Sequence, residues 1–244
     1  MASSLVAVLL WLTRPLLRLH LAHYKRDVKG AIFPTDDPEL SVPGPDPDKL
    51  LYIGDVAVAG YGVLHHGMTV TSQTARLIAH ARGKGCLWRT TAATDLTAKQ
   101  ATRKLDATML DAAILMIGVP DVLLATSATS WTASLSSIAE AIRGQSGPEC
   151  CLIFSAIPPM DQFRPIPPLA RKLLTLQIRR LDRATQRIAT QLPNTRFLPF
   201  PDLQNGNGYA EELFPWKSLH KIWAETIAHA TANAMEETEK RDLP

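Results

Sequence analysis

Short apolar runs alternate along the chain with segments whose apolar residues recur at helical spacing. The runs predict strands at 50–54, 85–89, 112–118, 150–156 and 195–199, and the other segments predict helices at about 68–82, 95–109, 130–143, 169–191 and 219–237. In 169–191 one face is formed by Leu173, Leu176, Ile178, Leu181, Ala184 and Ile188. Since the strands lack polar alternation and are separated by helices, the pattern predicts an α/β fold, a doubly wound three-layer sandwich with a mostly parallel five-stranded sheet.

The segments outside this pattern divide the chain further. Residues 1–28 predict an N-terminal apolar or amphipathic helix, and residues 29–48, rich in proline, glycine and aspartate, predict an irregular linker. The domain is expected at 49–237, followed by a charged tail at 238–244.

The N-terminal segment allows two interpretations. Its apolar octet at 5–12 is far shorter than the ~20 apolar residues that a membrane-spanning helix needs. It has no positive charge before it and no small-residue cleavage site after it, so cleaved export is the less favoured reading. A helix in the membrane interface, anchored by Trp11 and the arginines, and a helix packed on the domain remain open. We therefore expect a cytoplasmic protein, or one associated with the cytoplasmic face of a membrane through peripheral contact of residues 1–28.

The composition of the chain argues against some classes of binding partner. With 244 residues, 46% of them hydrophobic, the chain can bury the core of one domain. The net charge of +3 comes without a basic stripe interleaved with aromatics, so no nucleic-acid partner is predicted. The odd cysteine count (Cys86, Cys150 and Cys151) favours reduced, buried thiols, and no pair has zinc-ligand spacing. We predict no metal and no cofactor, and an unknown small ligand or protein as the partner.

Two strand ends predict the position of a crevice. In doubly wound sheets, ligands bind outside the carboxyl ends of the strands, where the strand order reverses. The first and third strands end in Gly54-Asp55-Val56 and Gly118-Val119-Pro120-Asp121. Asp55 is expected to accept hydrogen bonds from N–H groups of the turn. The proline-rich run 157–168 is expected to form a rigid loop that walls the crevice.

The same segments resemble the SGNH (GDSL) hydrolase family. The apolar run ending in Gly54-Asp55-Val56 is similar to the family's Gly-Asp-Ser block, and 118–121 to its Gly-x-Asn-Asp block. Residues 154–169 resemble a double-proline segment of one bacterial branch, and 217–220 resemble the closing Asp-x-x-His block. No glycine occurs at 88–94, where the family's glycine block should lie. The resemblance extends over roughly residues 46 to 235.

The resemblance implies an esterase site whose chemical groups are replaced. It implies a nucleophile at Val56, an oxyanion donor at Pro120, a base at His220 and a carboxylate orienting that base at Lys217. Valine has no hydroxyl, proline has no N–H, and lysine cannot accept the imidazole proton. Loss of a nucleophile alone costs on the order of 10⁶ in rate. We therefore predict a catalytically inactive pseudo-esterase with a binding or scaffolding role.

The predicted crevice contains the residues at both strand ends and the closing histidine. It comprises Asp55, Val56, Gly118, Pro120, Asp121 and a vestigial His220. The alternative is an ester or acyl hydrolase that uses a non-standard nucleophile or a water activated by His220 or Asp121. Its candidate hydroxyls are Thr69, Thr71, Ser72, Ser127, Ser130 and Ser155. A third possibility is a small-molecule binding module with an apolar pocket at Val56, recognised by stabilisation without product.

Overall fold

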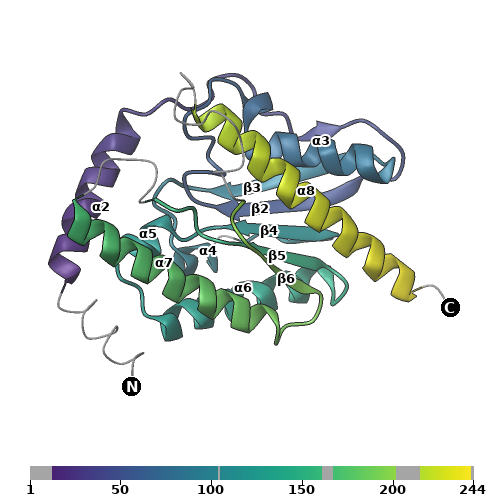
Figure 1. Ribbon diagram of the computed structural model, residues 1–244. Coiled ribbons are helices and arrows are strands. Elements are labelled where there is room, and N and C mark those ends of the chain that lie inside the picture. Colours follow the sequence, from purple (N-terminus) through teal and green to yellow (C-terminus); the bar gives the residue numbers. More distant parts are fainter. Residues whose placement is uncertain (1–12, 104, 161–166, 202–214, 243–244) are drawn as a thin grey trace.

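A six-stranded sheet forms the centre of the protein (Figure 1). The computed structural model describes residues 13–103, 105–160, 167–201 and 215–242. The strands are β1 (Ser41–Val42), β2 (Asp48–Gly54), β3 (Cys86–Ala92), β4 (Ala112–Met116), β5 (Cys151–Ser155) and β6 (Thr195–Leu198). Their order is β1-β3-β2-β4-β5-β6, and every pairing is parallel except that of β1 with β3. The predicted fold class is confirmed, and all five predicted strands are present.

The helices cover both faces of the sheet. They are α2 (Arg14–Lys29), the 3₁₀ helix η1 (His66–Met68), α3 (Val70–Arg82), α4 (Ala98–Ala101), α5 (Val119–Leu123), α6 (Ala128–Ser146), α7 (Pro168–Ala189) and α8 (Pro215–Asp242). Alternate residues of a strand point to opposite faces. Leu50 and Tyr52 therefore join the core beneath α3 and α8, while Leu51 and Ile53 join the core beneath α6 and α7.

The sheet has one strand more than the five that the apolar runs predict. The additional strand, β1, comes from the proline-rich segment expected to be a linker, and it pairs antiparallel with the start of β3. The N–H of Trp88 also donates to the carbonyl of Leu40, 3.0 Å away. A two-residue strand among prolines has no apolar alternation, so the pattern gives no signal for it.

The helix predicted at 95–109 is wrong in extent. Among the described residues of this range, only α4 is helical, and its N-terminus is closed by a capping box between Thr97 and Gln100. After α4 the described part of the backbone is not helical, because residues of α6 form hydrogen bonds with its N–H groups. The N–H of Ala107 donates to the Gln145 side chain (3.0 Å), and that of Leu110 donates to the Ser146 hydroxyl (2.9 Å). These tertiary hydrogen bonds override the local helical pattern.

Two predicted boundaries also differ. The strand predicted at 112–118 ends at Met116, because the chain turns at Gly118, whose φ is 144°. A Cβ at Gly118 would lie 2.6 Å from Ile157, so this close approach requires glycine. The closing helix begins at Pro215 and runs to Asp242, past the predicted end at 237.

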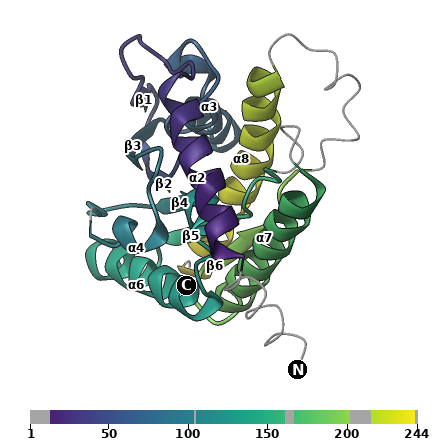
Figure 2. The same ribbon diagram turned by 90° about the vertical axis from the view of Figure 1, so that its left-hand side faces the viewer.

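Helix α2 packs on the domain (Figure 2). Leu17 is fully buried, the Tyr24 hydroxyl donates to the carbonyl of Thr94, and Lys25 forms an ion pair with Asp95 at 3.1 Å. Residues 14–29 therefore follow the second interpretation of the N-terminal segment, while residues 1–12 lie outside the described residues. Within the described ranges, the helices are too short or too polar to cross a membrane.

The three cysteines are free and buried, as predicted. Burial raises the pKa of the Cys86 and Cys150 thiols to about 12 and also raises that of Cys151. The thiolate form that reacts with oxidants and metals is therefore disfavoured at all three positions.

Candidate functional site

The strand order reverses between β2 and β4, and Asp55 joins the ends of these two strands. Its Oδ2 accepts hydrogen bonds from the N–H groups of Gly118 (2.9 Å) and Val119 (2.8 Å). Burial raises the pKa of the Asp55 carboxyl to about 7; the charge of Asp121 adds to this effect, whereas the backbone N–H groups oppose it. The two loops expected to share a crevice are thus in direct contact through this carboxyl group.

A cavity of about 420 Å³ lies beside these strand ends. Most of its lining is apolar, and one wall is helix α2. The lining residues are Leu19, His20, His23, Tyr24, Asp27, Val28, Val56, Ala57, Tyr61, Val119, Leu123, Pro158, Met160, Pro167, Leu174, Trp216, Leu219, His220 and Trp223. Pro158, Met160 and Pro167 bring the proline-rich run to the cavity, while residues 161–166 lie outside the described residues.

Val56 lines this cavity, so position 56 presents methyl groups to it. The residue is half-buried and packs against the core on the α6 and α7 side. Pro120 is buried at the start of α5, and among the described residues it is Val119, rather than Pro120, that lines the cavity. Of the six residues of the predicted crevice, Val56 and His220 are among the described residues that line the cavity, whereas Asp55, Gly118, Pro120 and Asp121 are not.

Asp121 points toward α4. Its Oδ2 accepts a hydrogen bond from the N–H of Ala98 (2.9 Å), and its Oδ1 accepts one from the Thr126 hydroxyl (2.8 Å). Burial raises the pKa of this carboxyl group. Both oxygens thus fix the start of α4 and the turn after α5.

Both ring nitrogens of His220 are bound to the backbone. Nδ1 accepts from the N–H of Val70 at 3.0 Å, and Nε2 lies 2.9 Å from the carbonyl oxygen of Tyr61. Since an N–H only donates and a carbonyl only accepts, the ring is neutral with its proton on Nε2. Burial lowers the pKa of His220 to about 4. Neither nitrogen has a lone pair left to take a proton from a substrate.

These two bonds fasten three elements together. His220 belongs to the first turns of α8, Val70 is the first residue of α3, and Tyr61 lies in the loop after β2. Lys217, at the position of the implied orienting carboxylate, is exposed. His220 thus acts as a structural bridge in this fold.

The hydroxyl groups considered as alternative nucleophiles cap helices or support packing. Thr69 accepts from the N–H of Ser72 at the start of α3, and its hydroxyl lies 2.9 Å from that of Thr71. Ser127 accepts from the N–H of Ser130 at the start of α6. The Ser155 hydroxyl accepts the indole N–H of Trp223 at 2.9 Å. None of these six residues is among the described residues that line the cavity.

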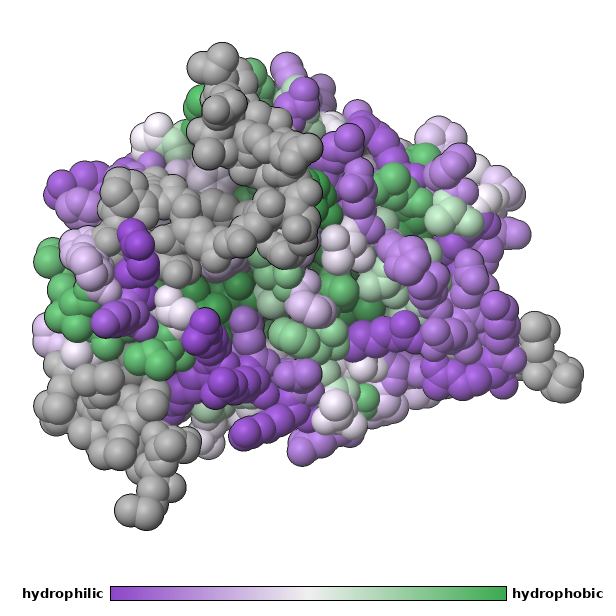
Figure 3. All heavy atoms as spheres, viewed as in Figure 1, coloured by the Kyte–Doolittle hydropathy of each residue, from purple (hydrophilic) through white to green (hydrophobic). Residues whose placement is uncertain are grey.

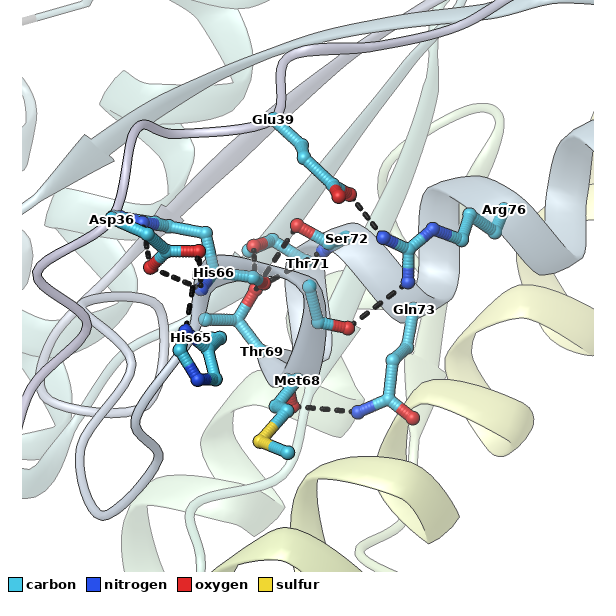
Figure 4. A network of polar contacts seen from close by, with 11 residues as sticks. Asp36, Glu39, His65, His66, Met68, Thr69, Thr71, Ser72, Gln73 and Arg76 are labelled. Atoms are coloured by element: carbon cyan, nitrogen blue, oxygen red, sulfur yellow. Dashed lines mark hydrogen bonds and ion pairs between the residues drawn. The ribbon is translucent and has the colours of Figure 1, made fainter.

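A polar network fixes the loop before α3 (Figure 4). Asp36 Oδ1 accepts a hydrogen bond from the N–H of His66 and lies 3.0 Å from the Nδ1 of the same residue. The Nδ1 of His65 lies 3.7 Å from the other oxygen of this carboxylate. Arg76 of α3 donates to the carbonyl of Gly67 at 3.0 Å and also pairs with Glu39. The segment expected to be a linker is thereby held against the domain. In the part of the chain that the structure describes, no three or more His, Cys, Asp or Glu residues form a group that could hold a metal ion.

The bridge formed by His220 predicts a pH dependence of stability. The unfolded histidine takes up a proton near pH 6.5, whereas the folded one stays neutral down to about pH 4. Its stabilising contribution should therefore be complete above pH 6.5 and should fall by about 3 kcal/mol as the pH drops to about 4. Urea unfolding of wild type and His220→Gln across this range measures the effect as a difference.

Taking the difference is necessary because Asp55 titrates in the opposite sense. Its folded pKa of about 7 lies above its ordinary value of 3.8, so its contribution weakens as the pH rises through this window. Because Asp55 is present in wild type and in His220→Gln, its effect on the free energy of unfolding cancels in the difference between the two proteins. A difference that does not change with pH would show that His220 is not held neutral in solution.

The site predicted from the sequence includes no residue of α2, although this helix forms one wall of the cavity. His20, His23, Tyr24 and Asp27 line the cavity at spacings of three and four residues, which places them on one helix face. This periodicity is visible in the sequence. Because these side chains are polar or amphipathic, a search for apolar periodicity passes over them.

Comparisons with known proteins agree with this architecture. The sequence model of the GDSL-like lipase/acylhydrolase family matches residues 52–227. A search of curated proteins gives no match. Among solved structures, a lipase from a goat rumen metagenome matches with a TM-score of 0.60 and 13% identity, covering 75% of this chain and 97% of that one.

Two further structures match at similar levels. A member of the lipolytic G-D-S-L family from Veillonella parvula DSM 2008 has a TM-score of 0.57 and 14% identity, covering 74% of this chain and 96% of that one. A family two carbohydrate esterase from Clostridium thermocellum, in complex with cellohexaose, has a TM-score of 0.52 and 15% identity over 79% of this chain. This chain spans 66% of that esterase. At such identities the likeness concerns the fold alone.

Proposed function

Because this chain belongs to the GDSL-like lipase/acylhydrolase family, we propose that it is a catalytically inactive member that binds an apolar small molecule in the cavity beside α2. Two residues carry the proposal together: Val56, which has no hydroxyl, and His220, which has no free nitrogen. A valine lines the cavity where the family resemblance implies the nucleophile, and the histidine implied as the base has both nitrogens on backbone groups. Acyl transfer needs a nucleophile and a base to activate it.

The size and lining of the cavity support a binding role. Small-molecule sites commonly enclose about 300–1,000 Å³ and combine apolar walls with a few polar groups. Here the cavity measures about 420 Å³, and the polar groups of α2 (His20, His23 and Asp27) lie on one wall. The ligand class that fits this distribution is an aliphatic chain with one polar end.

Binding of this class predicts thermal stabilisation without product. A medium-chain fatty acid at about 100 times its dissociation constant should raise the melting temperature by about 5–10 °C. Val56→Phe, which fills space in the cavity, should abolish the shift. Leu87→Phe adds similar bulk on the exposed side of β3 and should keep it. Melting curves, with chromatography of the recovered ligand, measure both effects.

Two results would contradict the proposal. No stabilisation by fatty acids of any chain length would argue against an aliphatic ligand in this cavity. Conversion of the corresponding methyl esters, lost in Val56→Phe and retained in Leu87→Phe, would show that the cavity is a working active site.

A further inference from the structure

Helix α7 carries a continuous basic stripe on its outer side. At 3.6 residues per turn, seven of its residues fall within an arc of about 100° along a helix of about 33 Å. All but one of the seven are exposed, and Arg180 is half-buried. They are Leu169, Lys172, Leu176, Arg179, Arg180, Arg183 and Arg187. We call them the α7 stripe.

The charge of the α7 stripe is uncompensated. Its five cations form no ion pair with any residue in the described ranges, whereas other arginines of the protein are paired, as in Arg82–Asp48 and Arg89–Asp106. The only acidic residue of α7 is Asp182, which lies outside the arc. Its Oδ1 accepts the N–H of Ile157 at 3.0 Å, so it faces the domain. The charged residues of the α7 stripe are therefore all positive.

Exposed leucines accompany these cations. Leu169 is 62% exposed and Leu176 is 36% exposed, although the sequence pattern groups Leu176 with the buried face. Leu19 of α2 is 62% exposed and lines the same cavity as Pro167 and Leu174 at the start of α7. Figure 3 shows hydrophobic and hydrophilic side chains side by side over the region where Figure 1 draws α7.

We propose that the α7 stripe is a docking surface for an anionic lipid bilayer. Arginine and lysine on a helix surface are attracted to anionic headgroups, and leucines among them can enter the boundary with the acyl chains. The phosphates of a nucleic acid would pair with the cations but would leave the leucines without apolar contacts. The first turns of α7 line the cavity through Leu174, which lies on the side of the helix opposite the stripe. The proposal rests on the stripe alone and is independent of what the cavity binds.

Flotation of the full chain with lipid vesicles tests the proposal. Vesicles contain either phosphatidylcholine alone or equal parts phosphatidylcholine and phosphatidylserine. Wild type should bind the anionic vesicles, and salt should weaken binding. Each neutralised cation should weaken binding about fivefold, so Arg179→Gln, Arg183→Gln and Arg187→Gln together should reduce the partition coefficient about 100-fold. Leu169→Gln with Leu176→Gln, which keeps all charges, should reduce it about tenfold or more.

A matched variant controls for overall charge. Lys99→Gln, Arg103→Gln and Lys221→Gln remove three exposed cations from other elements and should leave vesicle binding nearly unchanged. Circular dichroism checks that every variant folds. The proposal is overturned if the α7 arginine variant and the control bind vesicles alike, which would also attribute any binding to segments outside α7. It is equally overturned if wild type ignores anionic vesicles while the arginine variant alone loses binding to duplex DNA.

Discussion

Wild-type protein should release nitrophenol from a short-chain nitrophenyl ester no faster than buffer does, and restoring Val56→Ser should not change this. In serine hydrolases, loss of the nucleophile or of its base costs on the order of 10⁶ in kcat, so a functional triad would be obvious in the assay. A serine at position 56 would lack a base, because Nδ1 of His220 holds the N–H of Val70 and Nε2 donates to Tyr61. Adding Pro120→Asn and Lys217→Asp would leave this unchanged.

Variants of His220 make the assay decisive. Wild-type turnover that disappears in His220→Ala would reveal a non-standard nucleophile or an activated water, and would contradict the inactive assignment. Turnover gained by the triple variant and lost on adding His220→Gln would show that the ring can leave its backbone partners. A gain that survives His220→Gln would point to His20 or His23, the other imidazoles lining the cavity.

Replacing His220 by alanine should destabilise the protein by about 3–5 kcal/mol. The change leaves the N–H of Val70 and the carbonyl of Tyr61 without their partner, at about 1–3 kcal/mol for each buried group, and creates a void at a site that is only 3% exposed. Urea unfolding at pH 7 measures the loss as a lower transition midpoint.

A second histidine provides the control. His80→Ala removes an exposed imidazole from α3 and should change stability by about 0.5 kcal/mol or less. Equal midpoints for the two variants would mean that His220 does not bridge α8, α3 and the loop after β2 in solution. Such a result would also remove the structural reason for expecting no turnover from Val56→Ser.

The sequence predicts most of the sheet because buried parallel strands leave a strong trace. The strands β2, β4 and β5 contain runs of buried apolar residues, whereas β3 and β6 also contain Arg89 and Arg196. Asp55 is expected to accept N–H groups of its own turn, and the structure shows it accepting those of Gly118 and Val119 after β4. The position of the crevice is predicted from the ends of the first and third predicted strands and the rule that ligands bind where the strand order reverses. These features depend on local pattern and on general rules of topology.

The features that sequence reasoning misses depend on contacts between distant residues. The partners of His220 are backbone groups of Tyr61 and Val70, about 150 positions away, and no side-chain type marks them. The segment 95–109 has helical spacing throughout, yet its helix ends at Ala101, and Gln145 and Ser146 bind the backbone of Ala107 and Leu110 beyond it. Helix α2 becomes a cavity wall only once the domain is folded.

The two edge strands of the sheet limit the addition of a strand from another protein chain. An open edge strand invites strand addition by another chain and, in the extreme, aggregation. Here one edge ends in β1, two residues long and followed by Pro43, Pro45 and Pro47, which cannot donate ladder hydrogen bonds. The other edge is β6, four residues long, and it carries Arg196 paired with Glu237 of α8. Among the described residues, both edges of the sheet are therefore short, and their proline and charged residues disfavour strand addition.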